Sequence, residues 1–394
     1  MGIYPIITLK RGRERSVLHK HPWVFSGAVY QCEPAADGDI VTVKDINDNV
    51  LGYGFYAPHS QIIVKMFEFS AVYTDYYSVD YWQKKIYNAL QLRNTYVIND
   101  QTNTYRLIHA EGDGMPGVIA DVYAGTVVLN LLTKGVENIC SQLTEALANL
   151  GFNNIYLKVK GISHEKEKIV SESAWLKGKS EMPVMAKENV LKFWIDIEKG
   201  QKTGFFIDQR EHRRMLQMLC KGKTVLNTFS YTGGFSVYAI QGEAASVVSV
   251  DISKDAIQKC EENIALNFTN HSHHIAIAED CFEYLKKCDT KYDIVILDPP
   301  AFAKNARSVP NACRGYKELN MLGIKACNAK GLIFTFSCSQ NIDKRLFQQI
   351  VFSAAADVGR HVRIIAHLCQ PADHPVNIYH PESEYLKGLL LYVD

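Results

Sequence analysis

The sequence predicts an α/β protein with a doubly wound sheet at its carboxyl-terminal end, preceded by a β-rich barrel and a central α+β region. From about residue 186 onward, short apolar strands alternate with helical stretches, which is the pattern of parallel βαβ units. The region 1–70 is instead rich in short strands, and 71–185 mixes the two patterns. A chain of 394 residues is long enough for three domains, 1–70, 71–185 and 186–394.

The β-rich region carries a basic arm. Residues 39–58, DIVTVKDINDNVLGYGFYAP, alternate apolar and polar side chains around an Asn-Asp-Asn turn, which predicts a hairpin, and residues 60–69 indicate another strand. The arm at residues 9–23 holds a single acidic residue, Glu14, among five basic ones. These are Lys10, Arg11, Arg13, Arg15 and Lys20. Because the formal net charge is only +1, any nucleic-acid binding has to come from such a local patch.

The central region predicts helices and strands in alternation. Residues 79–98 have the spacing of an amphipathic helix, and residues 105–133 indicate three strands joined by a Gly-Pro and an Ala-Gly turn. Residues 135–151 predict one helix that ends at a glycine, and residues 153–161 a closing strand. The charged runs HEKEK (164–168) and LKGKSE (176–181) are expected to form an exposed loop.

The carboxyl-terminal region predicts five strands and the helices between them. The strands are TVLNTFS (224–230), ASVVSVD (245–251), HIAIAED (274–280), YDIVILDPP (292–300) and GLIFTFS (331–337). Helical stretches cover 254–267 and 315–331. In such sheets, ligands bind beyond the carboxyl ends of the strands, so the residues at those ends are the candidate site.

The composition narrows the class of protein. The ten cysteines are scattered and form no CxxC pair, which fits a reducing, cytoplasmic environment. No apolar run approaches the roughly 20 residues that a membrane helix needs, so no membrane contact is expected. The HSHH cluster at 271–274 lies between a helix and a strand, where a surface loop is favoured over a metal site; no metal is expected.

The first three strands end in residues suited to a nucleotide. Gly233 and Gly234 allow a tight turn and a close approach to the backbone, although they do not form the GxGxxG of dinucleotide enzymes. Asp251 ends the second strand, where a carboxylate can accept hydrogen bonds from both ribose hydroxyls. Asp280 ends the third strand. Each aspartate could instead cap a helix, but three successive strand ends of this kind favour a shared site.

The fourth and fifth strands bring a carboxylate and a thiol together. Pro299 and Pro300 fix the chain after Asp298, and Phe302 could stack on a flat substrate. In a sheet of order 3-2-1-4-5 the two strands are neighbours, about 5 Å apart. Cys338, just after the fifth strand, is therefore expected near Asp298, which distinguishes it from the other thiols.

Several motifs together resemble one family. GQKTGFFIDQREHR, VLNTFSYTGGFSV, VSVD, LDPPAF, CRGYKELNMLGIKACNAKGLIFTFSCS and ADHPV are similar to the bacterial large-subunit rRNA cytosine-5 methyltransferase I family. The likeness covers nearly the whole chain, since KRGRERSVLHKHPWVFSGAV resembles the family's RNA-binding PUA domain and the middle its EEHEE domain. It implies a class I methyltransferase sheet, S-adenosyl-L-methionine as cofactor and 23S rRNA as partner. Members of the family often form a homodimer, and the sequence leaves the oligomeric state open.

The resemblance also implies roles for individual residues. Cys338 matches the nucleophile that adds to carbon 6 of cytosine, and Asp298 the carboxylate that orients the base. Cofactor contacts fall on Asp208, Gln209, Arg210, Phe229, Ser230, Tyr231, Thr232, Gly233, Gly234, Asp251, Ile252, Ser253, Asp280, Cys281 and Asp298. Substrate contacts fall on Pro299, Pro300, Phe302, Lys10, Arg11, Arg13, Arg15 and Lys20.

Three alternatives stay open at this point. Asp-Pro-Pro with an aromatic residue also occurs in enzymes that methylate base amines such as that of guanine, and these need no cysteine. A catalytically inert RNA-binding protein would keep the basic arm. A dinucleotide dehydrogenase is disfavoured because the GxGxxG is absent.

The roles of two further features stay open. His374 in ADHPV either approaches the active site or serves a structural loop. The sequence has Pro300 where two-cysteine relatives have cysteine, so the base that takes the carbon-5 proton is unassigned.

Overall fold

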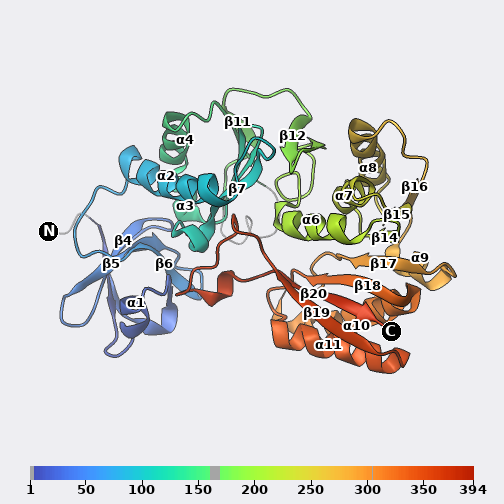
Figure 1. Cartoon of the computed structure of the whole chain (residues 1–394). Coiled ribbons are helices and arrows are strands. Elements are labelled where there is room, and N and C mark those ends of the chain that lie inside the picture. Colours follow the sequence, from blue (N-terminus) through green and yellow to red (C-terminus); the bar gives the residue numbers. More distant parts are fainter. Residues whose placement is uncertain (1–3, 160–168, 304) are drawn as a thin grey trace. The chain divides into compact units, whose positions relative to one another are not determined.

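The computed structural model describes residues 4–159, 169–303 and 305–394, and the chain divides into two units (Figure 1). The first unit consists of 1–189, 195–207 and 372–383, and the second of 190–194, 208–371 and 384–394. The segment 372–383 therefore belongs with the amino-terminal part of the chain although it is bounded on both sides by the second unit. The three-domain division expected from the sequence stays a prediction.

The amino-terminal region forms a six-stranded sheet of order β2-β6-β5-β4-β1-β3. Its strands are β1 (Ile6–Leu9), β2 (Trp23–Phe25), β3 (Val29–Cys32), β4 (Ile40–Lys44), β5 (Val50–Tyr56) and β6 (Ile62–Glu68), with the short helix α1 (Arg15–Leu18). The predicted hairpin is confirmed as β4 and β5. Asp45 fixes its turn by accepting the backbone N–H groups of Asn47 (2.8 Å) and Asn49 (2.9 Å).

The central region of the first unit forms a five-stranded sheet of order β11-β10-β9-β8-β7. Its strands are β7 (Thr104–His109), β8 (Val118–Tyr123), β9 (Thr126–Leu131), β10 (Asn154–Leu157) and β11 (Ala174–Lys177), and its helices α2 (Val79–Tyr96), α3 (Lys134–Asn138) and α4 (Cys140–Asn149). Its apolar faces share one core with Phe55 and Phe67 of the amino-terminal sheet. The helix α2 and the three strands between residues 105 and 133 are as predicted.

Two predictions for this region are wrong in detail. The single helix expected over 135–151 is two, because the fully buried Ile139 leaves helical geometry (φ −108°, ψ 15°) between α3 and α4. The loop expected over 176–181 begins inside β11, because Lys177 pairs with Ile155 and so completes the edge of β10. The other part of that loop, residues 164–168, lies outside the described residues.

The second unit contains a seven-stranded sheet of order β16-β15-β14-β17-β18-β20-β19. Its strands are β14 (Thr224–Thr228), β15 (Ser246–Asp251), β16 (His274–Ala278), β17 (Tyr292–Leu297), β18 (Cys327–Ser337), β19 (Val362–Cys369) and β20 (Lys387–Val393). The strands β14 to β18 are parallel in the predicted order 3-2-1-4-5. The antiparallel β20 enters between β18 and β19. The strands β19 and β20, which lie beyond residue 337, have no counterpart among the strands predicted from the sequence.

The helices of this unit are α6 (Arg210–Leu219), α7 (Gly234–Gln241), α8 (Lys254–Asn267), α9 (Cys281–Lys287), α10 (Val309–Ala326) and α11 (Lys344–Val358). The helices α10 and α11 pack side by side, and α7 packs against both α6 and α8 (Figure 1). The strands β12 (Val184–Glu188) and β13 (Leu191–Ile195) form a separate two-stranded sheet.

No helix in the described ranges is long and apolar enough to cross a membrane. No group of three or more His, Cys, Asp or Glu side chains there is arranged to hold a metal ion. The histidine cluster sits as predicted in the turn between α8 and β16, and only His274 enters the strand, where its Nε2 lies 2.8 Å from Ser249 Oγ.

Candidate cofactor and active site

The loop after β14 has an unusual backbone. Gly233 adopts a left-handed conformation (φ +80°) directly before α7, as its predicted role in a tight turn requires. Phe229 (φ +53°) and Tyr231 (φ +46°) also lie in the left-handed region, where side chains with a Cβ are disfavoured. A Cβ on Gly233 would collide with Cys260 of α8. The loop is therefore held in a conformation that its sequence alone would not prefer.

Asp251 holds this loop from the next strand. One carboxylate oxygen accepts the backbone N–H of Tyr231 (2.9 Å), and the other accepts that of Ser253 (2.9 Å). It does not cap α8, because Ser253 performs that function through the N–H of Ala256. The alternative of a simple helix cap is thus wrong for Asp251. Ile252, between the two, is exposed.

Asp280 and Cys281 lie at the end of the third strand. Asp280 caps α9 by accepting the N–H groups of Phe282 (2.9 Å) and Glu283 (3.1 Å) through the same oxygen. The thiol of Cys281 is buried in the core and accepts the N–H of Phe229 (3.1 Å). Burial raises its pKa to about 12, so it stays a thiol. The three strand ends therefore meet at the loop 229–234.

Asp298 and Cys338 follow neighbouring parallel strands. Leu297, the last residue of β17, lies opposite Thr335 of β18. Asp298 comes directly after β17 and Cys338 directly after β18, and both side chains are partly exposed. The prediction that the fourth and fifth strands are neighbours and end side by side is confirmed by the parallel pairing of β17 with β18.

The turn that carries Cys338 is fixed on both sides. Ser337 and Ser339 are fully buried. The hydroxyl of Ser339 accepts the backbone N–H of Ala303 (3.1 Å) and lies 3.0 Å from the hydroxyl of Tyr316. Ala303 belongs to the segment that follows Asp298. A hydrogen bond therefore links the two strand-end segments next to the residue that carries the thiol.

Pro299, Pro300 and Phe302 shape the other segment. Pro299 is buried and Pro300 exposed. The ring of Phe302 packs 4.6 Å from Tyr316 and 6.2 Å from Phe282, measured between ring centroids. This packing gives Phe302 a structural contact, and its stacking on a substrate stays a prediction.

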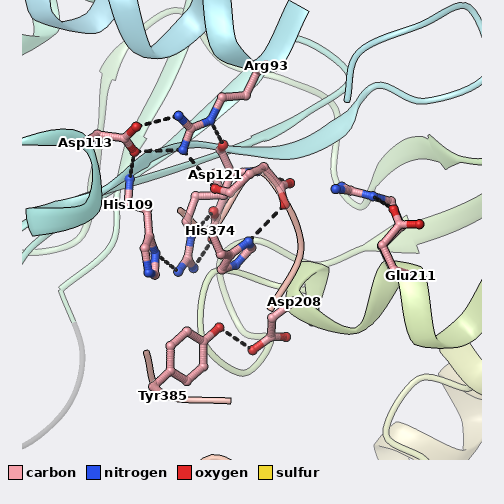
Figure 2. Close-up of polar contacts among 11 residues, drawn as sticks. Arg93, His109, Asp113, Asp121, Asp208, Glu211, His374 and Tyr385 are labelled. Carbon is pink, nitrogen blue, oxygen red and sulfur yellow. Dashed lines mark hydrogen bonds and ion pairs between the residues drawn. The ribbon is translucent and has the colours of Figure 1, made fainter. Parts of the chain in front are cut away.

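The predicted residues 208–210 lie at the start of α6 and are buried. Asp208 accepts the hydroxyl of Tyr385 (2.7 Å; Figure 2), and Gln209 Oε1 lies 2.5 Å from His212 Nδ1. Arg210 Nε donates to Glu211 (3.2 Å). Burial lowers the pKa of His212 to about 4. Since α6 packs on α7, these residues adjoin the helix that follows the glycine loop.

The basic arm lies in the first unit and is open to solvent. All five of its predicted side chains are exposed: Lys10, Arg11, Arg13, Arg15 and Lys20. Lys10 Nζ donates to the carbonyl of Gly27 (3.0 Å), and the ammonium of Lys20 lies over the ring of Tyr379 (5.7 Å). The guanidinium groups of Arg11, Arg13 and Arg15 are therefore accessible from solvent.

The structure favours the loop role for His374. It is buried with Asp373 in the first unit, 3.0 Å from its carboxylate, which also accepts the N–H of Arg106 (3.1 Å). The guanidinium of Arg93 donates a hydrogen bond to the carbonyl of Asp373. It also forms a bidentate ion pair with Asp113 (2.6 and 2.7 Å; Figure 2). This network anchors residues 372–383 to the first unit.

Sequence reasoning missed Lys387 and Tyr385, which lie at or next to the start of β20. Lys387 pairs with Ser337 across the antiparallel strands β20 and β18. A lysine at the start of the apolar run KGLLLYV was the available signal, because buried lysines are rare without a partner.

Known proteins match this chain along its length. The family model described as S-adenosylmethionine-dependent methyltransferase matches residues 105–322, and the one described as PUA-like domain matches residues 7–69. The ribosomal RNA large subunit methyltransferase I of Shewanella frigidimarina (strain NCIMB 400) is 39% identical over 98% of this chain and 99% of that protein. The protein of the same name from Enterobacter sp. (strain 638) is 39% identical over 97% and 98%.

Solved structures agree with the fold. The crystal structure of SMU.776 complexed with SAH superimposes with a TM-score of 0.85 at 25% identity, covering 98% of this chain and 99% of that one. Trm5b from Pyrococcus abyssi, at 16% identity, shares the fold over 70% of this chain and 74% of its own, with a TM-score of 0.52. The chain therefore belongs to the S-adenosylmethionine-dependent methyltransferase family, together with the ribosomal RNA large subunit methyltransferases I, and S-adenosylmethionine is its cofactor.

Proposed function

We propose that this enzyme methylates carbon 5 of a cytosine in large-subunit (23S) rRNA through a covalent adduct with Cys338. The rRNA substrate is supported by the names of relatives that are 39% identical over nearly the whole length. The observation that carries the choice of base is that Asp298 and Cys338 follow adjacent parallel strands. A thiol and a carboxylate in that relation suit cytosine, whose carbon 5 is too weak a nucleophile without activation.

The loop after β14 fits the cofactor. Gly233 lets the backbone turn closely before α7, and the partly exposed Asp251 can meet a ribose. The hydroxyl oxygen of Ser230 is buried and, among the described residues, makes no hydrogen bond, so it offers a polar contact to a bound group. We assign the cofactor to this loop, to Asp251 and to Asp280. The cofactor supplies an electrophilic methyl group.

The chemistry at Cys338 proceeds in four steps. Its thiolate adds to carbon 6 of the cytosine, forming a carbon–sulfur bond. The resulting electron density at carbon 5 would take up the methyl group that the cofactor supplies: a carbon–carbon bond forms, and the bond between that methyl and the cofactor's sulfur breaks with its electron pair left on the sulfur. A base removes the proton from carbon 5. The carbon–sulfur bond then breaks and its electron pair returns to sulfur. Asp298 would hold the N3 and N4 edge of the base while charge develops on the ring.

The basic arm supplies the contact with RNA. Its five exposed cations lie in the region that matches the PUA-like family model. Positive side chains of this kind bind phosphates without reading the sequence, which positions the RNA but leaves the choice of nucleotide to other contacts.

The identity of the methylated nucleoside tests the proposal. The protein is incubated with isotope-labelled S-adenosylmethionine and unmodified 23S rRNA, and the digested nucleosides are identified by mass spectrometry. We expect labelled 5-methylcytidine. A labelled N-methylguanosine would establish the amine-methylating alternative. Binding of RNA without any labelled nucleoside would contradict the proposal.

Two cysteine variants test the nucleophile. Cys338→Ala removes the thiol and is expected to abolish methylation while S-adenosylmethionine affinity is kept. Cys313→Ala removes a thiol of similar exposure on α10 and serves as the matched control, with activity close to that of the unaltered protein. Full turnover by Cys338→Ala would refute the adduct.

A further inference from the structure

Lys387 is a buried lysine beside the proposed nucleophile. It is the first residue of β20 and lies opposite Ser337, the residue before Cys338, in the antiparallel pairing of β20 with β18. Only 4% of its surface is exposed. A lysine is seldom buried to this degree, because removing an ammonium from water is costly unless other groups compensate.

Lys387 also contacts Ser339, the residue that follows Cys338. Its Nζ donates hydrogen bonds to the carbonyls of Ser339 (2.7 Å) and Tyr385 (2.6 Å). Strand pairing thus fixes Lys387 to the residue before Cys338, and a hydrogen bond fixes it to the residue after. An ammonium has three donors, and these two carbonyls occupy two of them.

Among the groups that can carry a negative charge near Lys387, Cys338 has the largest influence on its pKa. Burial is the largest influence and lowers the pKa of Lys387 to about 8, while Cys338, Glu384 and Asp343, in that order, act to raise it. Glu384 forms an ion pair with Lys344 (2.5 Å).

The remaining polar groups have other partners. Asp343 caps α11 by accepting the N–H of Leu346 (2.7 Å). The phenol of Tyr316, which lies against Ser339, is kept neutral because burial raises its pKa. Cys338 is therefore the anionic centre that gains most from this cation.

We infer that Lys387 is a positioning residue that stabilises the thiolate of Cys338, and so keeps the nucleophile ionised near neutral pH. The consequence for catalysis depends on the proposed role of Cys338. The thiol proton passes to water, and the thiolate, beside the ammonium, forms the bond to carbon 6. When that bond breaks, the returning electron pair is again met by the ammonium. Lys387 keeps its own proton throughout.

The ionisation of Cys338 should depend on pH through the charge of Lys387. Below about pH 8 Lys387 is charged and favours the thiolate; above this pH it loses its proton and the stabilisation with it. The thiolate should thus be present well below the usual thiol pKa of about 8.5.

Alkylation of Cys338 by iodoacetamide measures this ionisation without RNA or methyl transfer. The folded protein is treated between pH 6 and 9, and the modified peptides are quantified by mass spectrometry, with the exposed Cys32 of the first unit as internal control. At pH 7 we expect Lys387→Met to slow alkylation of Cys338 roughly tenfold, the effect of one pKa unit, and to leave Cys32 unchanged. Lys387→Arg keeps the charge and should react nearly as the unaltered protein.

Two results would overturn the inference. One is a Lys387→Met variant whose Cys338 is alkylated at the unaltered rate at pH 7. The other is a profile of the unaltered protein in which Cys338 ionises only near pH 8.5; this measurement needs no variant and decides the matter even where Lys387→Met does not fold. Full methylation by Cys338→Ala would instead remove the proposed function and leave the alkylation result standing.

Discussion

The hydroxyl oxygen of Ser339 accepts a 3.1 Å hydrogen bond from the backbone N–H of Ala303. This bond joins the segment after β17, which carries Asp298, to the segment after β18, which carries Cys338. The two residues proposed to handle the base are thus linked through backbone and one buried hydroxyl. The relative position of carboxylate and thiol depends on that link.

Ser339→Ala is expected to lower kcat about 10- to 100-fold with little change in S-adenosylmethionine affinity. The substitution leaves the N–H of Ala303 and the hydroxyl of Tyr316 without their buried partner, at a cost of about 1–3 kcal/mol. Single-turnover methylation and calorimetry measure the two quantities. Ser272→Ala, at an exposed turn, is the control. Equal losses of cofactor binding and turnover would contradict this assignment.

Gly233→Ala is expected to weaken S-adenosylmethionine binding at least tenfold and to destabilise the protein by about 2–4 kcal/mol. The new Cβ is strained at φ +80° and collides with Cys260. Gly222→Ala separates the two effects, because Gly222 has φ +67° but open space around it. Urea unfolding and calorimetry should show a smaller loss of stability and unchanged cofactor binding for this control. Identical behaviour of the two variants would argue against a crowded cofactor loop.

Neutralising Arg11 and Arg13 together is expected to weaken RNA binding and to flatten its salt dependence. Each lost phosphate contact reduces the slope of log affinity against log salt by about 0.7–0.9. Titrations of labelled rRNA fragments at several salt concentrations measure the slope. Replacing Lys221 and Lys286 by Gln removes the same charge from the second unit and should leave the slope unchanged. A slope that does not differ between the double variants would exclude the arm from the interface.

The second unit is expected to lose stability as the pH falls through about 6.5. Burial lowers the pKa of His212 to about 4, below its unfolded value of about 6.5, so between these limits the unfolded chain binds a proton that the folded one does not. The free energy of unfolding should drop by roughly 1–3 kcal/mol between pH 7 and 4.5. His212→Gln should reduce this drop in urea titrations. His367→Gln, at an exposed site, should not.

Much of the sheet was predictable from local sequence. The strands β14 to β18 are apolar runs that end in Gly, Asp, Pro or Ser, and this punctuation marks both the strands and the edge where ligands bind. Asp251 and Cys338 could be selected because the strand order makes their strand ends neighbours of those that carry the glycine loop and Asp298.

The other features of the fold and the site depend on contacts between residues far apart in the sequence, which the local sequence pattern does not reveal. Lys387 meets Cys338 only because β20 inserts antiparallel beside β18, after an excursion of the chain through the first unit at 372–383. The helix expected over 135–151 divides at Ile139, whose backbone leaves helical geometry (φ −108°, ψ 15°) although the residues on both sides are helical, and the local pattern contains no Gly or Pro that marks this break. The contacts of Asp208 with Tyr385 likewise join residues far apart in sequence.

The most direct test of the proposed mechanism is to trap the covalent adduct between Cys338 and the RNA. In rRNA that contains 5-fluorocytidine, carbon 5 carries fluorine in place of the proton that a base must remove, so the reaction should stop with the RNA bound to sulfur. We predict a covalent protein–RNA complex that requires S-adenosylmethionine, with the nucleotide attached to the peptide that contains Cys338. Attachment at another cysteine, or complete absence of the complex while unmodified rRNA is methylated, would contradict the proposed mechanism.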